Sequence, residues 1–162
     1  MKRFRNLFVP VSMLVMFLGL AATGMRAQSL SSTQFVGKFT LPFAAEWGHM
    51  SLPPGDYNLY YGHMSASGIN IVEVADPETG VSNGFSLVRG RDDAKGEGSF
   101  LVCVFEGDKG YVHSLQMAEI GESVEFPKPH GVSVAAWIVA GNENHNTNTR
   151  LAEMRIPVVP VK

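Results

Sequence analysis

The side chains in this sequence that could bind a ligand are aromatic rings. Along one expected strand, Tyr60 points to the face opposite Tyr57 and Tyr61, because successive side chains of a strand alternate between its two faces. A ring exposed on a sheet can stack on a sugar or anchor a partner protein. Trp47, Tyr60 and Trp137 are therefore our candidate binding residues. The alternative is that such rings pack in the core, where large aromatics dominate.

The histidines predict no metal site, because no two of them share a ligand spacing such as His-x-His or His-Glu-x-x-His. The five are His49, His63, His113, His130 and His145. His113 lies among apolar residues, where we expect a hydrogen-bonded, half-buried ring. We therefore expect no bound metal and no cofactor.

Cys103 is the only cysteine of the chain, so neither an intramolecular disulfide nor a metal site made of cysteines alone is possible. It lies in the apolar run 100–105. A reactive cysteine needs solvent access and a lowered pKa. The sequence therefore predicts a buried and unreactive thiol.

Two weaker patterns could carry chemistry in loops. Residues 131–135 place Ser133 at the spacing of a nucleophile elbow, but that elbow needs a strand before it, a helix after it and a large α/β sheet around it. Asp92, Asp93 and Glu97 could gather oxygen ligands for Ca²⁺, although their spacing departs from an EF-hand and neighbouring basic residues offset the charge. Neither pattern predicts a catalytic residue.

The N-terminus has the order of a secretory signal peptide. Residues 1–6 carry three basic side chains, residues 7–22 carry no charge, and small residues follow. We expect 1–27 to be a signal peptide cleaved after Ala27, with an exit at 22–24 as the alternative. An uncleaved anchor is the other interpretation, but the apolar run is shorter than the ~20 residues that span a bilayer. We therefore expect export to the periplasm or the medium, with no stable membrane span after processing.

Composition and charge exclude one class of partner. The chain has 162 residues, of which 45% are hydrophobic and 17% are charged, so it suits one compact domain rather than a disordered chain. Residues 1–27 hold four of the 13 basic residues and none of the 15 acidic ones, so residues 28–162 carry a net charge of −6. Such a domain lacks the basic excess that neutralises nucleic-acid phosphates. We therefore expect no nucleic-acid partner.

Short strands are expected along the whole of this mature chain. Alternating or apolar runs predict them at 33–43, 57–61, 69–75, 85–89, 99–106, 111–117, 123–126 and 151–159, while 132–140 could be a strand or a short helix. Turn signals separate the strands: a type II turn at residues 53–55, a tight hairpin at 83–84 and a charged loop at 89–98.

The spacing of these strands indicates the fold class. Turns every ~8–12 residues without a helical period are typical of an all-β fold. We expect residues 28–162 to form a single antiparallel β-sandwich of about seven to nine strands, with a small closed β-barrel as the alternative. Within that fold, alternation predicts that Tyr111, His113, Leu115 and Met117 share one face of their strand.

A series of short motifs runs through most of the mature chain. They are Phe39-Thr40-Leu41-Pro42-Phe43, Trp47, Leu52-Pro53-Pro54-Gly55-Asp56-Tyr57, residues 119–127 and Arg155-Ile156-Pro157-Val158. In this order they resemble small secreted bacterial proteins of uncharacterised function. The resemblance implies a signal peptide and one β domain, and it supplies no catalytic residue.

These observations predict a secreted or periplasmic, non-enzymatic β-sandwich domain that acts as a binding or structural module of the envelope. The expected partner is an envelope or extracellular ligand, either a glycan or a protein. The alternative is a small hydrolase or metal-dependent enzyme whose site is built from loops.

Overall fold

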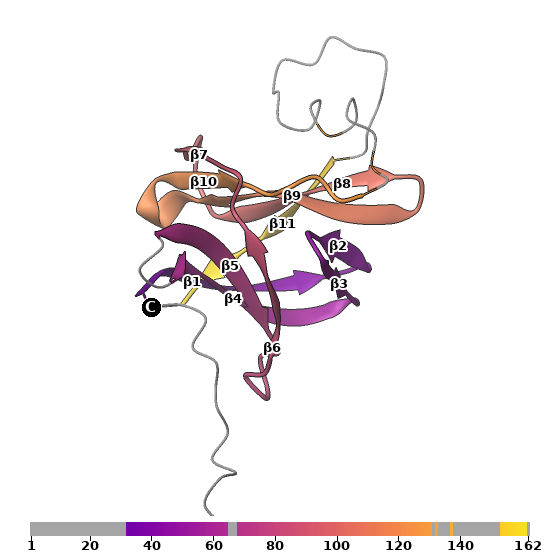
Figure 1. Cartoon of the computed structure of the whole chain (residues 1–162), viewed down its shortest axis with the longest axis horizontal. Coiled ribbons are helices and arrows are strands. Elements are labelled where there is room, and N and C mark those ends of the chain that lie inside the picture. Colours follow the sequence, from indigo (N-terminus) through magenta and orange to yellow (C-terminus); the bar gives the residue numbers. More distant parts are fainter. Residues whose placement is uncertain (1–31, 65–67, 131, 133–136, 138–152, 162) are drawn as a thin grey trace, which may run out of the picture.

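The computed structural model describes residues 32–64, 68–130, 132, 137 and 153–161, which form two β-sheets packed face to face (Figure 1). The all-β prediction and the sandwich are confirmed, and the two sheets are not closed into a barrel. The expected signal peptide 1–27 lies outside the described residues. So does nearly all of 132–140, the segment that we left open between strand and helix.

Five of the described strands form an antiparallel sheet that we call sheet A. Its order is β12-β1-β4-β5-β6. The strands are β1 (Ser32–Leu41), β4 (Gly55–Met64), β5 (Ile69–Ala75), β6 (Ser82–Leu87) and β12 (Val159–Pro160). Because β4 lies between β1 and β5, it is central, and its side chains face the core on one side and the exterior on the other.

The other seven strands within the described part of the chain form sheet B. Five follow the order β11-β8-β9-β10-β7, and a β2–β3 hairpin joins this sheet where β2 pairs with β9 in parallel. The strands are β2 (Ala45–Trp47), β3 (Met50–Leu52), β7 (Gly90–Asp93), β8 (Phe100–Glu106), β9 (Lys109–Met117), β10 (Glu122–Glu125) and β11 (Glu153–Pro157). A short 3-10 helix, η2 (Ala118–Ile120), connects β9 to β10.

The core lies between the two sheets and is built by alternate residues of each strand. On β1 and β4 the inward side chains are aromatic rings and leucines, and β8 and β9 add aliphatic and sulfur-containing side chains. The largest fully buried side chains are Trp47, Tyr61, Phe126, Leu41, Leu52, Leu59, Ile71, Leu101, Leu115 and Met117. Cys103 is also fully buried, as predicted, and burial raises the pKa of its thiol to about 12.

Two stretches of chain cross from one sheet to the other and so join the sheets at both sides. Between β6 and β7, the Val88 N–H donates to a carbonyl of β5 over 3.1 Å and the Arg89 N–H donates to a carbonyl of β10 over 2.8 Å. Between β11 and β12, the Val158 N–H donates to the Ser99 carbonyl over 2.9 Å, and directly after β12 the Val161 N–H donates to a carbonyl of β1 over the same distance. These crossings hold the sheets together through backbone hydrogen bonds as well as through the core.

The motif at residues 52–57 forms a tyrosine corner, a turn in which a tyrosine hydroxyl bonds to the backbone upstream. The Tyr57 hydroxyl donates to the Pro53 carbonyl over 2.7 Å. The predicted type II turn is wrong, because Gly55 has a φ of 158° rather than the value near +80° that such a turn requires. Gly55 is instead the first residue of β4, paired with Leu41.

Two other turn predictions are also wrong. The predicted hairpin at Asn83-Gly84 lies inside β6, where the pairing with β5 is irregular and an extra residue bulges. The actual turn precedes it and is built on Asp76, whose Oδ1 accepts the Thr79 N–H over 2.7 Å and the Glu78 N–H over 3.0 Å. The expected charged loop at 89–98 contains β7, which pairs with β10.

The prediction that Tyr111, His113, Leu115 and Met117 share one face of β9 is wrong, because the strand contains a bulge. The pairing between β8 and β9 shifts at Cys103, so that β9 carries one extra residue at His113. A bulge of this kind interrupts the two-residue alternation of a strand. Tyr111 and His113 therefore point to the outer face of sheet B, whereas Leu115 and Met117 point into the core.

Candidate binding surfaces

The outer face of sheet A carries an aromatic row that crosses four strands. Val36, Tyr60, Glu73 and Phe85 are successive partners across β1, β4, β5 and β6, so their side chains share that face. Tyr60 is partly exposed, as the alternation predicts, and Phe85 is 47% exposed. Because neighbouring strands lie ~4.8 Å apart, the backbones that carry the two rings are about 10 Å apart, and Glu73 lies in the row between them.

Aliphatic side chains extend this row toward the crossing between the sheets. Leu87 lies two residues beyond Phe85 on β6 and is 46% exposed, and Ile69 on β5 is 44% exposed. Ile71, which pairs with Leu87, is fully buried between them. We call Tyr60, Ile69, Phe85 and Leu87 the sheet A patch. Contiguous exposed apolar groups of this kind mark interaction sites, whereas single ones are common on any protein surface.

Trp47 is a core residue and contributes nothing to this surface. Its side chain is fully buried, and its ring packs edge-on against Phe126 at 4.9 Å and against Phe39 at 6.1 Å between ring centroids. The reason is its position on β2, a strand that joins sheet B by pairing with β9 and whose Trp47 side chain points into the core. Core packing, the alternative for this ring, is therefore correct, and Trp47 is not an exposed binding residue.

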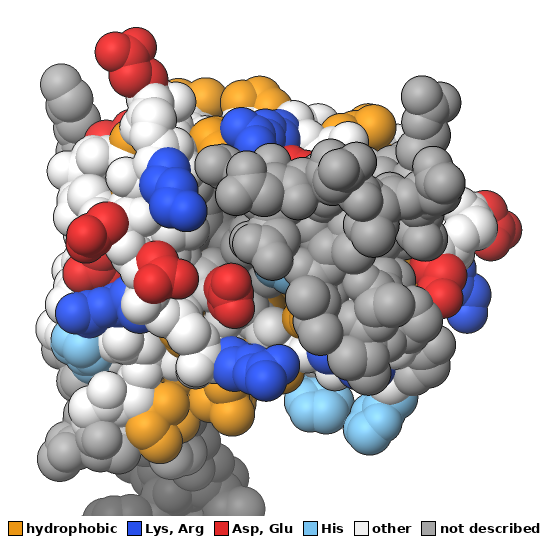
Figure 2. Space-filling model, turned by 90° about the horizontal axis from the view of Figure 1, so that it is seen from above, with side chains coloured by type: hydrophobic (Ala, Val, Ile, Leu, Met, Phe, Trp, Pro, Cys, Tyr) orange, Lys and Arg blue, Asp and Glu red, His pale blue; other side chains and the backbone are white. Residues whose placement is uncertain are grey.

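Trp137 is also buried, but outside the main core. It is 6% exposed and clusters with Val104, Tyr111 and Val132 on the outer face of sheet B. Val132 and Trp137, which follow β10 in the chain, therefore cover this part of the face; we call these two residues the cover. Figure 2 views the molecule from this side, where Lys and Arg are interspersed with Asp and Glu over the described surface.

His113 is the polar group beneath the cover. It is 3% exposed, its ring lies 4.6 Å from the Trp137 ring, and its Nε2 lies 3.1 Å from the Trp137 carbonyl oxygen. Because a carbonyl only accepts, Nε2–H is the donor and Nδ1 carries a lone pair. Burial lowers the pKa of His113 below its usual value, while the carboxylates of Glu125 and Glu153 and the bond to Trp137 oppose that shift.

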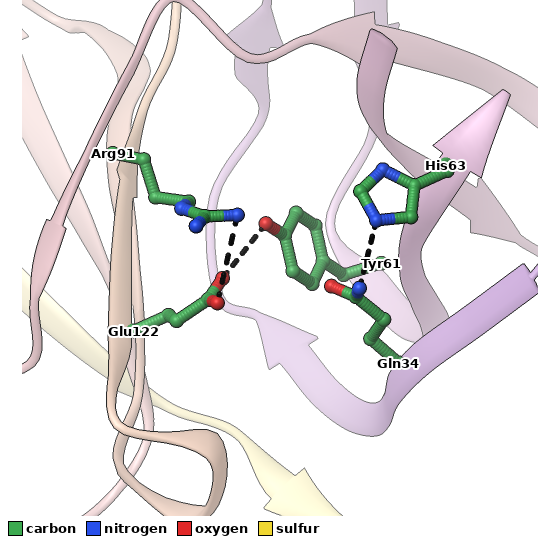
Figure 3. A network of polar contacts seen from close by, with 5 residues as sticks. All are labelled: Gln34, Tyr61, His63, Arg91 and Glu122. Carbon is green, nitrogen blue, oxygen red and sulfur yellow. Dashed lines mark hydrogen bonds and ion pairs between the residues drawn. The ribbon is translucent and has the colours of Figure 1, made fainter. Parts of the chain in front are cut away.

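A polar network at one end of the sandwich ties sheet A to sheet B (Figure 3). The Tyr61 hydroxyl on β4 donates to the Glu122 carboxylate on β10 over 2.9 Å, and Arg91 on β7 lies 3.7 Å from the other oxygen. Burial, with the hydrogen bond to Glu122, raises the pKa of Tyr61 to about 12. A phenol that stays protonated at neutral pH acts as a donor, so this network serves to join the sheets. Gln34 donates to His63 beside it over 2.8 Å.

A groove of about 670 Å³ lies at the opposite end of sheet A, between the tyrosine corner and the Asp76 turn. Its lining combines apolar residues of the corner with the carboxylates of Asp56, Asp76 and Glu78. Hydrogen bonds from Thr79 to its carboxylate hold the pKa of Asp76 below its usual range, so this group is ionised at neutral pH. Asp56 accepts from the Thr40 hydroxyl over 2.5 Å across the β1–β4 pair, whereas Asp76 accepts within its own turn, so each carboxylate serves the local structure.

The remaining candidates of the sequence do not come together in space. In the part of the chain that the structure describes, no three His, Cys, Asp or Glu side chains are placed to hold a metal ion. Asp92 and Asp93 lie on β7 and are exposed, as is Glu97. Ser133 lies outside the described residues, as does His145.

The sequence identified Tyr60 but missed the rest of the sheet A patch. Phe85 and Leu87 alternate with Ser86, which is the pattern of a two-faced strand, but only the pairing with β5 shows that their side of the strand faces outward. The contact between His113 and Trp137 has no signal in the sequence, because the residues are 24 positions apart and not joined by a regular element.

Comparison with known proteins identifies no relative of this chain. No family model matches it, and neither a curated protein nor a solved structure is significantly similar to it. Among the described residues, no helix has both the length and the apolar character needed to cross a membrane.

Proposed function

We propose that this protein is an exported, non-enzymatic binding module that holds its ligand on the outer face of sheet A. One observation carries the proposal: the sheet A patch gathers exposed aromatic and aliphatic side chains around the Glu73 carboxylate. Export is proposed from the charge and hydropathy order of residues 1–27. By its signal peptide and single β domain, the chain is proposed to be one of the small secreted bacterial β-domain proteins.

The energetic cost of the patch supports a role for it. Fully burying a Phe or Leu side chain stabilises a protein by about 1.5–3 kcal/mol, and the chain forgoes roughly half of this gain at Phe85 and Leu87. On sheet B the equivalent face is covered by residues of the same chain. A binding function explains why one face is covered and the other is left open.

The proposed ligand is a glycan or a protein of the envelope or the extracellular space. Tyr60 and Phe85 present two aromatic side chains from backbones that are about 10 Å apart on this face. Sugar rings stack on the faces of such aromatic rings through their C–H groups. Leu87 and Ile69 add the aliphatic surface on which a protein partner would pack.

Co-sedimentation of residues 28–162 with envelope fractions and with insoluble polysaccharides, peptidoglycan included, tests this proposal. The variants are Tyr60→Thr and Phe85→Thr, because threonine keeps the β-propensity of each position. Val81→Thr is the matched control, since Val81 is 63% exposed but lies in the turn before β6. We expect a loss of affinity of about tenfold or more for each patch variant, which is about 1.4 kcal/mol, and none for the control.

Binding by the wild type that all three variants retain would refute the role of the patch. Sedimentation with none of the fractions would refute the glycan and envelope ligands. The alternative function, an enzyme built from loops, is favoured by no feature of the described residues.

A further inference from the structure

β6 is an outermost strand of sheet A that lacks the usual protection against pairing with another chain. It pairs with β5 on one side, and no strand of the described residues pairs with its other side, which we call the open edge. Charged side chains, proline, bulges and short length protect such strands. β6 has the sequence Ser-Asn-Gly-Phe-Ser-Leu, with no charge and no proline, and its bulge is confined to Asn83. The β2–β3 hairpin approaches β6 from the core side, where a Cβ at Gly84 would meet the Met50 side chain at 2.9 Å.

The other outermost strands in the described part of the chain carry that protection. β12 has two residues, one of them Pro160, and β3 has three. Three of the four residues of β7 are charged, and β11 contains Glu153 and Arg155. β6 is thus the outermost strand whose side chains least oppose the approach of a further strand.

The backbone of β6 directs the N–H and C=O groups of Phe85 and Leu87 to the open edge. The Val88 N–H donates to the Asn70 carbonyl of β5 over 3.1 Å. Because these groups alternate along an antiparallel strand, every second residue back from Val88 faces β5, whereas Leu87 and Phe85 face away. The Ser86 hydroxyl lies 3.5 Å from the Leu87 carbonyl, which is too long for a good hydrogen bond. The open edge therefore offers a row of donors and acceptors that matches the backbone of another strand.

We propose that β6 pairs with β6 of a second copy of this chain, so that two domains form a dimer around one continuous sheet. An antiparallel pairing with a two-fold axis at Ser86 places Phe85 of each copy opposite Leu87 of the other. In this register the N–H and C=O groups of each of these residues bond to those of the opposite residue. The strand is complementary to itself, and it carries no charge that would repel its copy.

The pairing would also join the sheet A patches of the two copies. Side chains that lie opposite each other on paired strands share one face of the sheet, so Phe85 of one copy and Leu87 of the other contact on the outer face. Dimer formation uses the edge of β6, whereas the proposed ligand binding uses the outer face. Either can therefore occur without the other, and the dimer presents two binding surfaces side by side.

Sedimentation velocity of residues 28–162 at concentrations from about 1 µM to about 1 mM tests the dimer over the same range of dissociation constants. Leu87→Pro is the test variant, because proline removes the N–H that faces the open edge and leaves the hydrogen bonds with β5. Leu87→Thr is the matched control, because it removes the same side chain but keeps the N–H and the β-propensity. Far-UV circular dichroism shows whether both variants keep the fold.

We expect the wild type and Leu87→Thr to shift from monomer to dimer as the concentration rises. The dissociation constant of Leu87→Pro should exceed that of Leu87→Thr by about tenfold or more, because each copy loses a hydrogen bond across the axis. A wild type that stays monomeric throughout would overturn the proposal. Equal dimerisation of Leu87→Pro and Leu87→Thr would overturn it as well, since the copies would then meet through another surface. The samples contain no ligand, so the result is separate from that of the binding test.

If Leu87→Pro does not fold, amide hydrogen exchange of the wild type decides. A higher protein concentration should slow exchange at the Phe85 and Leu87 N–H groups, because the dimer holds them in hydrogen bonds. The Val88 N–H is the internal control, since it is already bonded to β5 in the single domain. Exchange at Phe85 and Leu87 that does not depend on concentration would overturn the proposal.

Discussion

The outer faces of the two sheets both carry apolar side chains, but those on sheet B are buried and those of the sheet A patch are exposed. On sheet B, outward apolar residues of β8 and β9 are buried beneath Val132 and Trp137. On sheet A, the outward residues Phe85 and Leu87 of β6 remain nearly half exposed. Residues of the chain itself cover this part of sheet B, whereas the side chains of the sheet A patch are exposed.

This difference separates what stabilises the molecule from what it offers to a ligand. Apolar groups that are already buried contribute to the free energy of unfolding, whereas exposed ones contribute only when a partner covers them. Substitutions on the covered face of sheet B should therefore lower the free energy of unfolding, whereas substitutions in the sheet A patch should lower the affinity for a ligand.

Trp137→Ala should cause the largest loss of stability. Truncation of a buried tryptophan costs about 3–5 kcal/mol, and we expect the lower end because the cluster around Trp137 is small. Urea unfolding at neutral pH measures the loss. A change below about 1 kcal/mol would mean that the cover does not stabilise the domain, and the contrast between the faces would fail.

Tyr61→Phe should cause a smaller loss, because it removes the hydrogen bond that joins β4 to Glu122 on β10. A bond of this kind contributes about 1 kcal/mol, and the Arg91–Glu122 pair that remains is too exposed to replace it. Tyr60→Phe is the control on the same strand, since its hydroxyl lies on the outer face. Equal losses for the two variants in urea unfolding would show that Tyr61 does not join the sheets.

Phe85→Thr should lower the free energy of unfolding by only about 1 kcal/mol, less than Trp137→Ala, because nearly half of the residue is exposed. The same variant should lose ligand binding, so stability and function separate at one position. If Phe85→Thr destabilised the domain as much as Trp137→Ala, the ring would be part of the fold rather than of a binding surface.

Alternation in the sequence was sufficient to predict most strands and the sandwich, because one residue in two must face the core. Alternation was also sufficient to predict that Tyr60 points out of the core, because it lies on the face opposite Tyr57 and Tyr61. It failed at β9, where the bulge at His113 reverses the alternation. A bulge is set by pairing with the neighbouring strand, and the residues of β9 alone do not reveal it.

The errors at the candidate site have a similar origin. Trp47 sits on a three-residue strand of a hairpin that the sequence did not indicate, and its burial follows from the parallel pairing of β2 with β9. Trp137 is buried by residues of β8 and β9 that are distant in the chain. Burial of both rings depends on tertiary contacts, whereas the exposure of Tyr60 follows from local geometry, which explains why only Tyr60 was placed correctly.

Hydroxyl-radical footprinting with mass spectrometry tests the contrast between the faces most directly, because it reports the solvent access of individual side chains in the native protein. Tyr60 and Tyr111 form a matched pair, one on the outer face of each sheet, as do the rings of Phe85 and Trp137. At neutral pH we expect Tyr60 and Phe85 to be modified readily and Tyr111 and Trp137 to be protected. Equal modification of the two tyrosines, or protection of Phe85 in the unliganded protein, would contradict the account of one covered and one open face.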